Sequence, residues 1–390
     1  MPEPIWNLFA TATFGVESVV ARELNHLGFG ETTIDNGRIH FTGDAAALVR
    51  ANLWLRTAER VFVRIGRFQA LTFDELFEGT KALPWEDWLP EDAEFPVTGS
   101  CVKSLLMSVP DCQAIIKKAV VERMKTRYRR TLFPEDGPRY RIEFTLLGDV
   151  ATLAIDSSGT GLHKRGYRTL THAAPIKETL ASALLLISRW SPRRALIDPF
   201  CGSGTIPIEA AMMALDIAPG LEREFDCQEW DQIPRSVWYD ALAEARSRVR
   251  NDVALPILGS DISTEAVDLA MHHAKLAGVA RAIRLRRQDV RQIASEEKYG
   301  FVVTNPPYGQ RIGEEKENAR LFRETGDAFA RLDTWSFYVI SPDPNFEKAF
   351  GRPANRKRKL YNGGIRCDYY QFWGPRPERP SDGSGPHSEA

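Results

Sequence analysis

The sequence has no long apolar run, no paired-cysteine motif and almost no net charge. No apolar stretch reaches the roughly 18 residues of a membrane-spanning helix, and the N-terminus lacks the basic start and apolar run of a secretory signal. The five cysteines are an odd number without a CxxC pair, which argues against a disulfide framework and a zinc site. We therefore expect a cytoplasmic protein with no membrane contact and no bound metal.

The net charge of −1 does not indicate nucleic-acid binding by the chain as a whole. Positive charge is nevertheless gathered in three clusters, at residues 123–130, 281–291 and 352–359. Such clusters can bind phosphates locally, or they can be solvated helix faces and loop ends. The sequence leaves both interpretations open for each cluster.

The first 166 residues mix helices and strands in an α+β pattern. Residues 60–68 alternate apolar and polar side chains, as a half-buried strand does. Thr72 followed by Glu75 has the pattern of a capping box at a helix start. Gly148-Asp149, between two β-prone runs, is a strong hairpin signal. From about residue 167 the pattern of helical and β-prone segments changes.

The C-terminal half alternates helical stretches with short β-prone runs. This pattern predicts a mainly parallel sheet in a doubly wound α/β domain. The predicted strands are 195–200, 257–261, 283–288, 301–304 and 335–341. Two further runs, 359–361 and 367–373, flank Asn362-Gly363-Gly364 and predict a closing hairpin.

A glycine-rich turn follows the first of these strands, in Asp198-Pro199-Phe200-Cys201-Gly202-Ser203-Gly204-Thr205. Glycine lets the backbone approach a ligand closely, and a helix N-terminus offers free N–H groups to an anion. In S-adenosylmethionine that anion is the methionine carboxylate, and Asp198 can pair with the ammonium. The G-x-G-x-x-G/A fingerprint fails because Pro207 takes its third position, which disfavours NAD. Cys201 fits a small loop residue better than a nucleophile.

Acidic residues end the next two strands. Asp261, before Ile262, can accept hydrogen bonds from ribose hydroxyls, and it can also cap the following helix. It lies much farther from the glycine loop than the usual offset of about 20 residues, which leaves residues 218–252 as an insertion. Asp289, before Val290, can accept from an adenine amino group, although strand ends often carry Asp in turns.

The fourth strand ends in Thr304-Asn305-Pro306-Pro307-Tyr308, where an open α/β sheet binds its ligands. An exocyclic amine is a poor nucleophile because its lone pair is delocalised into the ring. The Asn305 side-chain oxygen and the Pro306 carbonyl can accept its two N–H bonds and favour a pyramidal nitrogen. The prolines stiffen the loop, and Tyr308 can stack on a flipped base. A structural proline-rich turn is the alternative.

Together these loops resemble the class I methyltransferases, whose parallel sheet is closed by an antiparallel hairpin, unlike that of dinucleotide-binding Rossmann domains. More narrowly, the chain resembles a bacterial family in which an RNA-binding THUMP domain precedes the methyltransferase. Members are often described as N6-adenine DNA methylases, and the characterised relatives are large-subunit ribosomal RNA guanine-N2 methyltransferases. The resemblance covers residues 5–374 and includes the segments 52–58, 156–168, 173–180 and 358–363.

The resemblance implies an α/β fold with a seven-stranded, Rossmann-like catalytic sheet preceded by α+β domains. The implied parts are a ferredoxin-like region (1–62), a THUMP domain (63–166) and a methyltransferase domain (167–374), and composition predicts a disordered tail (375–390). The methyl donor S-adenosylmethionine is expected at Asp198, Pro199, Cys201, Gly202, Gly204, Thr205, Asp261, Ile262, Asp289, Val290 and Asn305. The target base is expected at Asn305, Pro306, Pro307 and Tyr308.

The first choice of reaction is methylation of a guanine N2 in 23S ribosomal RNA, by a protein that we expect to be a monomer. A transfer-RNA guanine-N2 enzyme is the runner-up, because THUMP domains also serve tRNA enzymes. Adenine N6 and protein glutamine use the same loop, but no DNA-reading domain is recognisable, and the N-terminal half argues against glutamine. A non-catalytic RNA-binding assembly factor is the alternative from another class, and the intact loops count against it.

Overall fold

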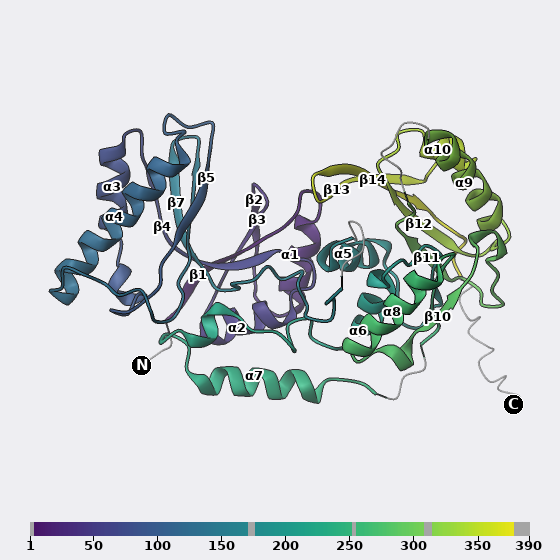
Figure 1. Cartoon of the computed structure of the whole chain (residues 1–390), viewed down its shortest axis with the longest axis horizontal. Helices are drawn as coiled ribbons and strands as arrows, with labels where there is room; N and C mark the ends of the chain where they lie inside the picture. The colour runs from purple at the N-terminus through teal and green to yellow at the C-terminus, as the bar shows by residue number, and fades with distance from the viewer. Residues whose placement is uncertain (1–3, 171–175, 252–254, 308–313, 378–390) are drawn as a thin grey trace, which may run out of the picture. The chain divides into compact units, whose positions relative to one another are not determined.

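A computed structural model describes residues 4–170, 176–251, 255–307 and 314–377 (Figure 1). The chain divides into two compact units. The first comprises Met1–Ala183, Met212–Val253 and Leu360–Gly363, and the second comprises Leu184–Ala211, Ala254–Lys359 and Gly364–Ala390. The predicted disordered tail, 375–390, lies almost wholly outside the described residues. The predicted boundary between residues 62 and 63 falls inside the first unit and stays a prediction.

The first unit is built on one seven-stranded sheet with the order β2-β3-β1-β4-β7-β6-β5. Strand β4 pairs with β1 on one side and with β7 on the other, so one continuous sheet includes strands from residues 1–62 and from residues 63–166. The pairs are antiparallel except β5 with β6, which are parallel. The strands are β1 (Trp6–Thr11), β2 (Thr33–Asp35), β3 (Arg38–Gly43), β4 (Arg60–Gln69), β5 (Val97–Val102), β6 (Ile142–Leu147) and β7 (Val150–Asp156).

Local sequence signals set the ends of several elements in this unit. Asp44 caps α2 by accepting a hydrogen bond from the Ala47 amide, and Thr72 and Glu75 form the predicted capping box of α3. Gly148 and Asp149 both have positive φ, as a tight hairpin turn requires. The helices are α1 (Glu17–His26), α2 (Ala45–Trp54), α3 (Phe73–Lys81), α4 (Val109–Tyr128) and α7 (Arg235–Ser247), with 3-10 turns at Trp85–Asp87 and Asp226–Glu229.

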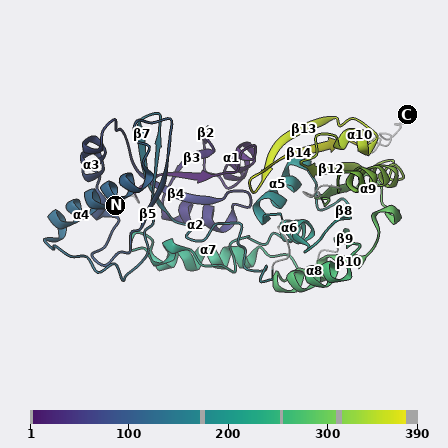
Figure 2. The same cartoon turned by 45° about the horizontal axis from the view of Figure 1, so that its top comes forward.

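The predicted insertion, residues 218–252, belongs to the first unit rather than to the second. Trp230 stacks on Tyr140 with ring centroids 4.8 Å apart, and its indole N–H donates to the Arg139 carbonyl at 2.8 Å. The Gly220 amide bonds the Leu53 carbonyl at 2.9 Å. Helices α2 and α7 lie side by side in both views (Figure 2). The insertion therefore adds core to the N-terminal half.

The second unit contains a seven-stranded sheet with the order β10-β9-β8-β11-β12-β14-β13. The first five strands are parallel and β14 is antiparallel to β12, as the sequence predicts. From β8 the chain adds β9 and β10 on one side of the sheet and then β11 and β12 on the other side. Ligands are therefore expected beyond the carboxyl ends of β8 and β11, where this change of direction occurs. The strands are β8 (Leu196–Asp198), β9 (Ile257–Asp261), β10 (Arg284–Arg287), β11 (Phe301–Thr304), β12 (Ser336–Ser341), β13 (Arg356–Asn362) and β14 (Ile365–Phe372).

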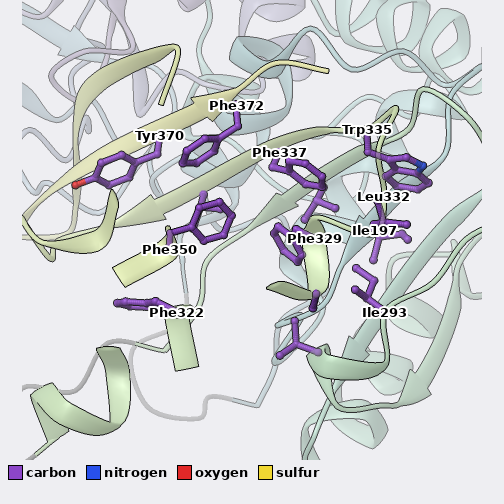
Figure 3. Close-up of a cluster of buried hydrophobic side chains, with 14 of the residues drawn as sticks. Ile197, Ile293, Phe322, Phe329, Leu332, Trp335, Phe337, Phe350, Tyr370 and Phe372 are labelled. Carbon is purple, nitrogen blue, oxygen red and sulfur yellow. The ribbon is translucent and has the colours of Figure 1, made fainter. Parts of the chain in front are cut away.

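An aromatic-rich core cluster includes buried residues of β8, β11, β12 and β14 (Figure 3). Phe329 stacks on Phe337 with ring centroids 4.9 Å apart, and Phe350 packs on Phe372 at 4.8 Å. Burying rings of this size contributes most of the stability of such a layer. The helices are α5 (Glu178–Ser188), α6 (Thr205–Ala214), α8 (Thr264–Leu276), α9 (Glu314–Phe329) and α10 (Phe346–Phe350), with 3-10 turns at Ala280–Ala282 and Val290–Gln292. Within the described ranges, no helix combines the length and apolarity needed to cross a membrane.

Candidate functional site

The glycine loop between β8 and α6 has the geometry of a ligand cradle. Gly202 has φ +49°, and a Cβ added there would meet no atom within 4 Å. Gly204 has φ +84°, and its Cβ would lie 2.9 Å from the Ala270 Cβ on α8. Gly204 is therefore required for packing, whereas Gly202 leaves open space beside the first turn of α6.

Two buried side chains join the carboxyl ends of β8 and β11. Thr304 donates its hydroxyl hydrogen to Asp198 Oδ1 at 2.6 Å, and the Phe200 amide donates to the same oxygen at 3.2 Å. Burial raises the pKa of Asp198 to about 7, although these hydrogen bonds act in the opposite direction. The structure thus holds Asp198 directly beside the residue that precedes Asn305.

The Asn305 side chain places a buried hydrogen-bond acceptor at the end of β11. Its Oδ1 atom is buried and has no hydrogen-bond partner among the described residues. A buried acceptor without a donor costs about 1–3 kcal/mol, so this oxygen is suited to accept a hydrogen bond from a ligand. Pro306 is buried and Pro307 is exposed. Tyr308 lies outside the described residues, and its stacking role stays a prediction.

Asp261, at the end of β9, supports the glycine loop. Its Oδ2 accepts from the Gly202 amide at 3.1 Å, and its Oδ1 accepts from the Ser263 amide at 3.0 Å. The alternative that Asp261 caps the next helix is wrong, because Ser263 caps α8 by accepting from the Ala266 amide. The neighbouring Ile262 side chain is 62% exposed, which leaves an apolar surface at the same strand end.

Asp289 is engaged within its own turn. It accepts from the Arg291 amide at 2.9 Å and forms an ion pair with the Arg291 guanidinium at 2.5 Å. The hydrogen bond from Arg291 lowers the pKa of Asp289. Contact with an adenine amino group stays a prediction and would compete with Arg291. Val290 is buried in a hydrophobic core cluster of the second unit.

Three residues for which the sequence predicted no role complete the loop. Ala270 of α8 packs under Gly204, Thr304 fixes Asp198, and the His273 ring nitrogen Nδ1 lies 3.1 Å from the Ser203 carbonyl. Their signals in the sequence are weak, because small, hydroxyl and buried His residues occur throughout helices and strands. Cys201 is buried, and burial raises the pKa of its thiol, so a nucleophilic role is disfavoured.

The residues present fit S-adenosylmethionine. The open space beside Gly202, the first turn of α6 at Thr205 and the exposed Ile262 side chain lie at neighbouring strand and helix ends. They offer backbone N–H groups for a carboxylate and apolar surface for a ring. Pro199 and Cys201, the remaining residues predicted to contact S-adenosylmethionine, are buried within the glycine loop.

Models of three protein families match successive parts of the chain. A ferredoxin-like domain named for RlmL matches residues 7–62, and a THUMP domain matches residues 70–156. The RMKL-like methyltransferase domain matches residues 165–371, which is more than half of the chain.

Individual relatives are similar along nearly the whole length. "Putative RNA methyltransferase YpsC" of Bacillus subtilis (strain 168) is 48% identical, over 96% of this chain and 98% of the relative. A crystal structure from Listeria monocytogenes, titled as a "predicted N6-adenine-specific DNA methylase", is 49% identical with a TM-score of 0.91, covering 95% of this chain and 97% of that one. SMU.472, crystallised with SAH, is 41% identical with a TM-score of 0.92, covering 97% and 100%.

Proposed function

From the premise that this chain belongs to the family of RMKL-like methyltransferases, with S-adenosylmethionine as its methyl donor, we propose that it methylates the exocyclic N2 of a guanine in 23S ribosomal RNA. The observation that carries the proposal is the buried, unpartnered Oδ1 atom of Asn305. This oxygen can accept a hydrogen bond from an N–H group of the substrate. It lies at the end of β11, next to the strand that leads into the glycine loop.

Asn305 acts by orienting the amino group. When its Oδ1 accepts one N–H and the Pro306 carbonyl accepts the other, the nitrogen becomes pyramidal and its lone pair leaves the ring system. These acceptors are fixed before the substrate arrives, so they stabilise the reacting geometry without reorganising. The restricted φ of Pro306 and Pro307 keeps them in place.

S-adenosylmethionine supplies an electrophilic methyl group when it is bound. The Asn305 amide cannot take up a proton, so the proton on the target nitrogen leaves late, to water or a neighbouring group. Asp261 keeps the glycine loop in its cradle conformation through the Gly202 amide. Asp198, fixed by Thr304, supplies the carboxylate for the donor ammonium.

The choice of RNA is supported by the N-terminal half and by the name of the Bacillus relative. The choice of guanine is supported by the family resemblance, since the loop itself fits any planar amino group. Transfer RNA is the second candidate substrate, because THUMP domains also occur in tRNA enzymes. Adenine is the base named for the Listeria relative, and it fits the same two acceptors.

Purified chain, incubated with S-adenosylmethionine bearing a deuterated methyl group and with RNA from a strain lacking its gene, tests the proposal. We expect deuterated N2-methylguanosine in 23S RNA when the nucleosides are resolved by mass spectrometry. Label in N2-methylguanosine of tRNA alone, or in N6-methyladenosine, would replace the proposed substrate. No label in any RNA would refute the proposed activity.

A further inference from the structure

The packing of a helix on a strand brings two cysteine side chains together in the first unit. The Cys101 sulfur on β5 lies 3.9 Å from the Cys112 sulfur in the first turn of α4, eleven positions later in the chain. Helix α4 packs on β5, which ends the sheet order beside β6 (Figure 1). Both thiols are reduced. A disulfide bond of about 2.05 Å requires the sulfurs to approach by about 2 Å, and a strand at the end of a sheet can make such a small shift.

The segment 103–108, between β5 and α4, is anchored to the turn between β6 and β7. The Leu105 amide donates to Asp149 Oδ1 at 2.6 Å, and the Asp149 amide donates to the Ser104 hydroxyl oxygen at 3.0 Å. Pro110 restricts the backbone in the first turn of α4. Because the fold already holds both ends of this segment, bonding the two sulfurs adds little loop-closure entropy cost in the folded protein.

The two thiols differ in their access to solvent. Cys101 is half-buried, whereas Cys112 is fully buried, as are the other three cysteines, Cys201, Cys227 and Cys367. A water-soluble oxidant therefore reaches Cys101 first. Burial, and after it the nearby Cys101 sulfur, raise the pKa of Cys112 to about 12, so Cys112 is a protonated thiol at neutral pH. These differences give the two cysteines separate chemical roles.

We propose that Cys101 and Cys112 form a reversible modification site for small-molecule disulfides such as oxidised glutathione, with Cys101 as the attacking thiol and Cys112 as the resolving thiol. First, the Cys101 thiolate attacks one glutathione sulfur, the glutathione S–S bond breaks, and one glutathione leaves with the Cys101 proton. The Cys112 sulfur then attacks the Cys101 sulfur, and the second glutathione leaves with the Cys112 proton. The two thiols lose two electrons and two protons, and two molecules of reduced glutathione are formed.

The disulfide joins β5 covalently to the first turn of α4 and closes the segment 103–108 into a ring. Two apolar side chains of this segment face solvent, since Leu105 is 71% exposed and Met107 is 57% exposed. Oxidation therefore restricts the motion of an exposed apolar segment, and reduction by an excess of thiol releases it. In a reducing compartment such a bond is transient, which suits a response to oxidants rather than a permanent crosslink.

The test is incubation of the folded, full-length chain with oxidised glutathione, followed by alkylation of the remaining thiols, trypsin digestion and mass spectrometry. Trypsin cleaves after Lys103, between the two cysteines, so the disulfide appears as peptide 82–103 linked to peptide 104–117. We expect this linked pair to form with the loss of two hydrogen atoms and to disappear after treatment with dithiothreitol. Amide hydrogens of residues 103–108 should exchange more slowly in the oxidised chain than in the reduced chain.

Three variants assign the roles of the two thiols. Cys112→Ala should stop after the first step and carry one glutathione on Cys101, because no resolving thiol remains. Cys101→Ala should leave Cys112 unmodified, since Cys112 is buried and protonated. Cys367→Ala, at a buried cysteine of β14, is the matched control and should form the linked peptides like wild type.

The proposal is overturned if wild type accumulates the Cys101–glutathione adduct without linked peptides, because the sulfurs then do not meet in the folded protein. Linked peptides that form only in urea, or a wild-type chain left unmodified by oxidised glutathione, would also overturn it. These measurements use neither RNA nor the methyl donor, so their outcome is independent of the proposed function.

Discussion

At the scale of single residues, the central position is Asn305. Replacing it with alanine removes the acceptor that orients the amino group and should leave the glycine loop intact. We expect Asn305→Ala to lower kcat about a hundred-fold or more, with S-adenosylhomocysteine affinity within about two-fold of wild type by calorimetry. Asn345→Ala, on an exposed turn of the same unit, is the matched control and should keep full turnover. Full activity of Asn305→Ala would refute the assigned role.

Asp198 gives the site a pH dependence. Burial raises its pKa to about 7, and only the ionised carboxylate can pair with the donor ammonium. Affinity for S-adenosylhomocysteine should therefore rise by about ten-fold per pH unit up to pH 7 and then level off. For the donor-free protein the sign is opposite: the stability contribution of Asp198 is present below about pH 4 and is lost as pH rises through 7.

Calorimetry between pH 5.5 and 8.5 checks this prediction. Asp198→Asn should bind weakly with a flat pH profile, since asparagine does not ionise. Asp289→Asn should retain the wild-type slope, because the Asp289 pKa is already lowered by Arg291 and the group stays ionised across this range. A slope that survives in Asp198→Asn would contradict the assignment.

Residue types predicted where the candidate site residues lie in the fold but not their hydrogen bonds. The sequence placed Asp198, Asp261 and Asn305 at strand ends, and the structure has them there. It did not predict that Thr304 holds Asp198 or that Asp261 holds the Gly202 amide. Those hydrogen bonds depend on which strands are neighbours, and a strand's own sequence does not specify its neighbour.

At the scale of elements, the two glycines of the loop should behave differently. Alanine at Gly204 requires positive φ and places a Cβ 2.9 Å from the Ala270 Cβ. We expect Gly204→Ala to lower the free energy of unfolding by about 2 kcal/mol or more. Gly202→Ala meets no protein atom, so it should lose less stability but should weaken donor binding by filling the cradle.

Thermal unfolding and calorimetry on the two variants separate these effects. The expected order is a lower Tm for Gly204→Ala than for Gly202→Ala. If Gly202→Ala binds S-adenosylhomocysteine like wild type, the donor does not approach the loop at that glycine.

Most elements were predictable because their signals are local. The capping box at Thr72, the turn at Gly148-Asp149 and the closing hairpin at Gly363 follow from short-range backbone preferences. The hairpin strands β13 and β14 are longer than predicted, because Arg356 and Lys357 lie on an edge strand whose charge hides its β pattern.

At the scale of the whole molecule, the insertion strengthens the first unit. Trp230 is 2% exposed, stacks on Tyr140 and donates to the Arg139 carbonyl. Trp230→Ala should cost about 3–5 kcal/mol of unfolding free energy, measured by chemical denaturation. Trp373, which is 53% exposed, offers the matched control, and Trp373→Ala should change stability little. Equal effects of the two substitutions would contradict the packing role of the insertion.

Contacts between distant parts of the chain were the least predictable level. The boundary between residues 62 and 63 stays a prediction, and the structure adds that β4 carries one sheet through both regions. The sequence identified 218–252 only as an insertion, because nothing local shows that Trp230 stacks on Tyr140, a residue far earlier in the chain.

The most direct test of the central claim is nucleoside mass spectrometry of separated 23S RNA and tRNA from a strain lacking the gene. Complementation with wild type and with Asn305→Ala identifies the loop as the source of the activity. We predict that one N2-methylguanosine is lost from 23S RNA and is restored by wild type but not by Asn305→Ala. Loss of N2-methylguanosine from tRNA only, or an unchanged nucleoside profile in both RNAs, would contradict the claim.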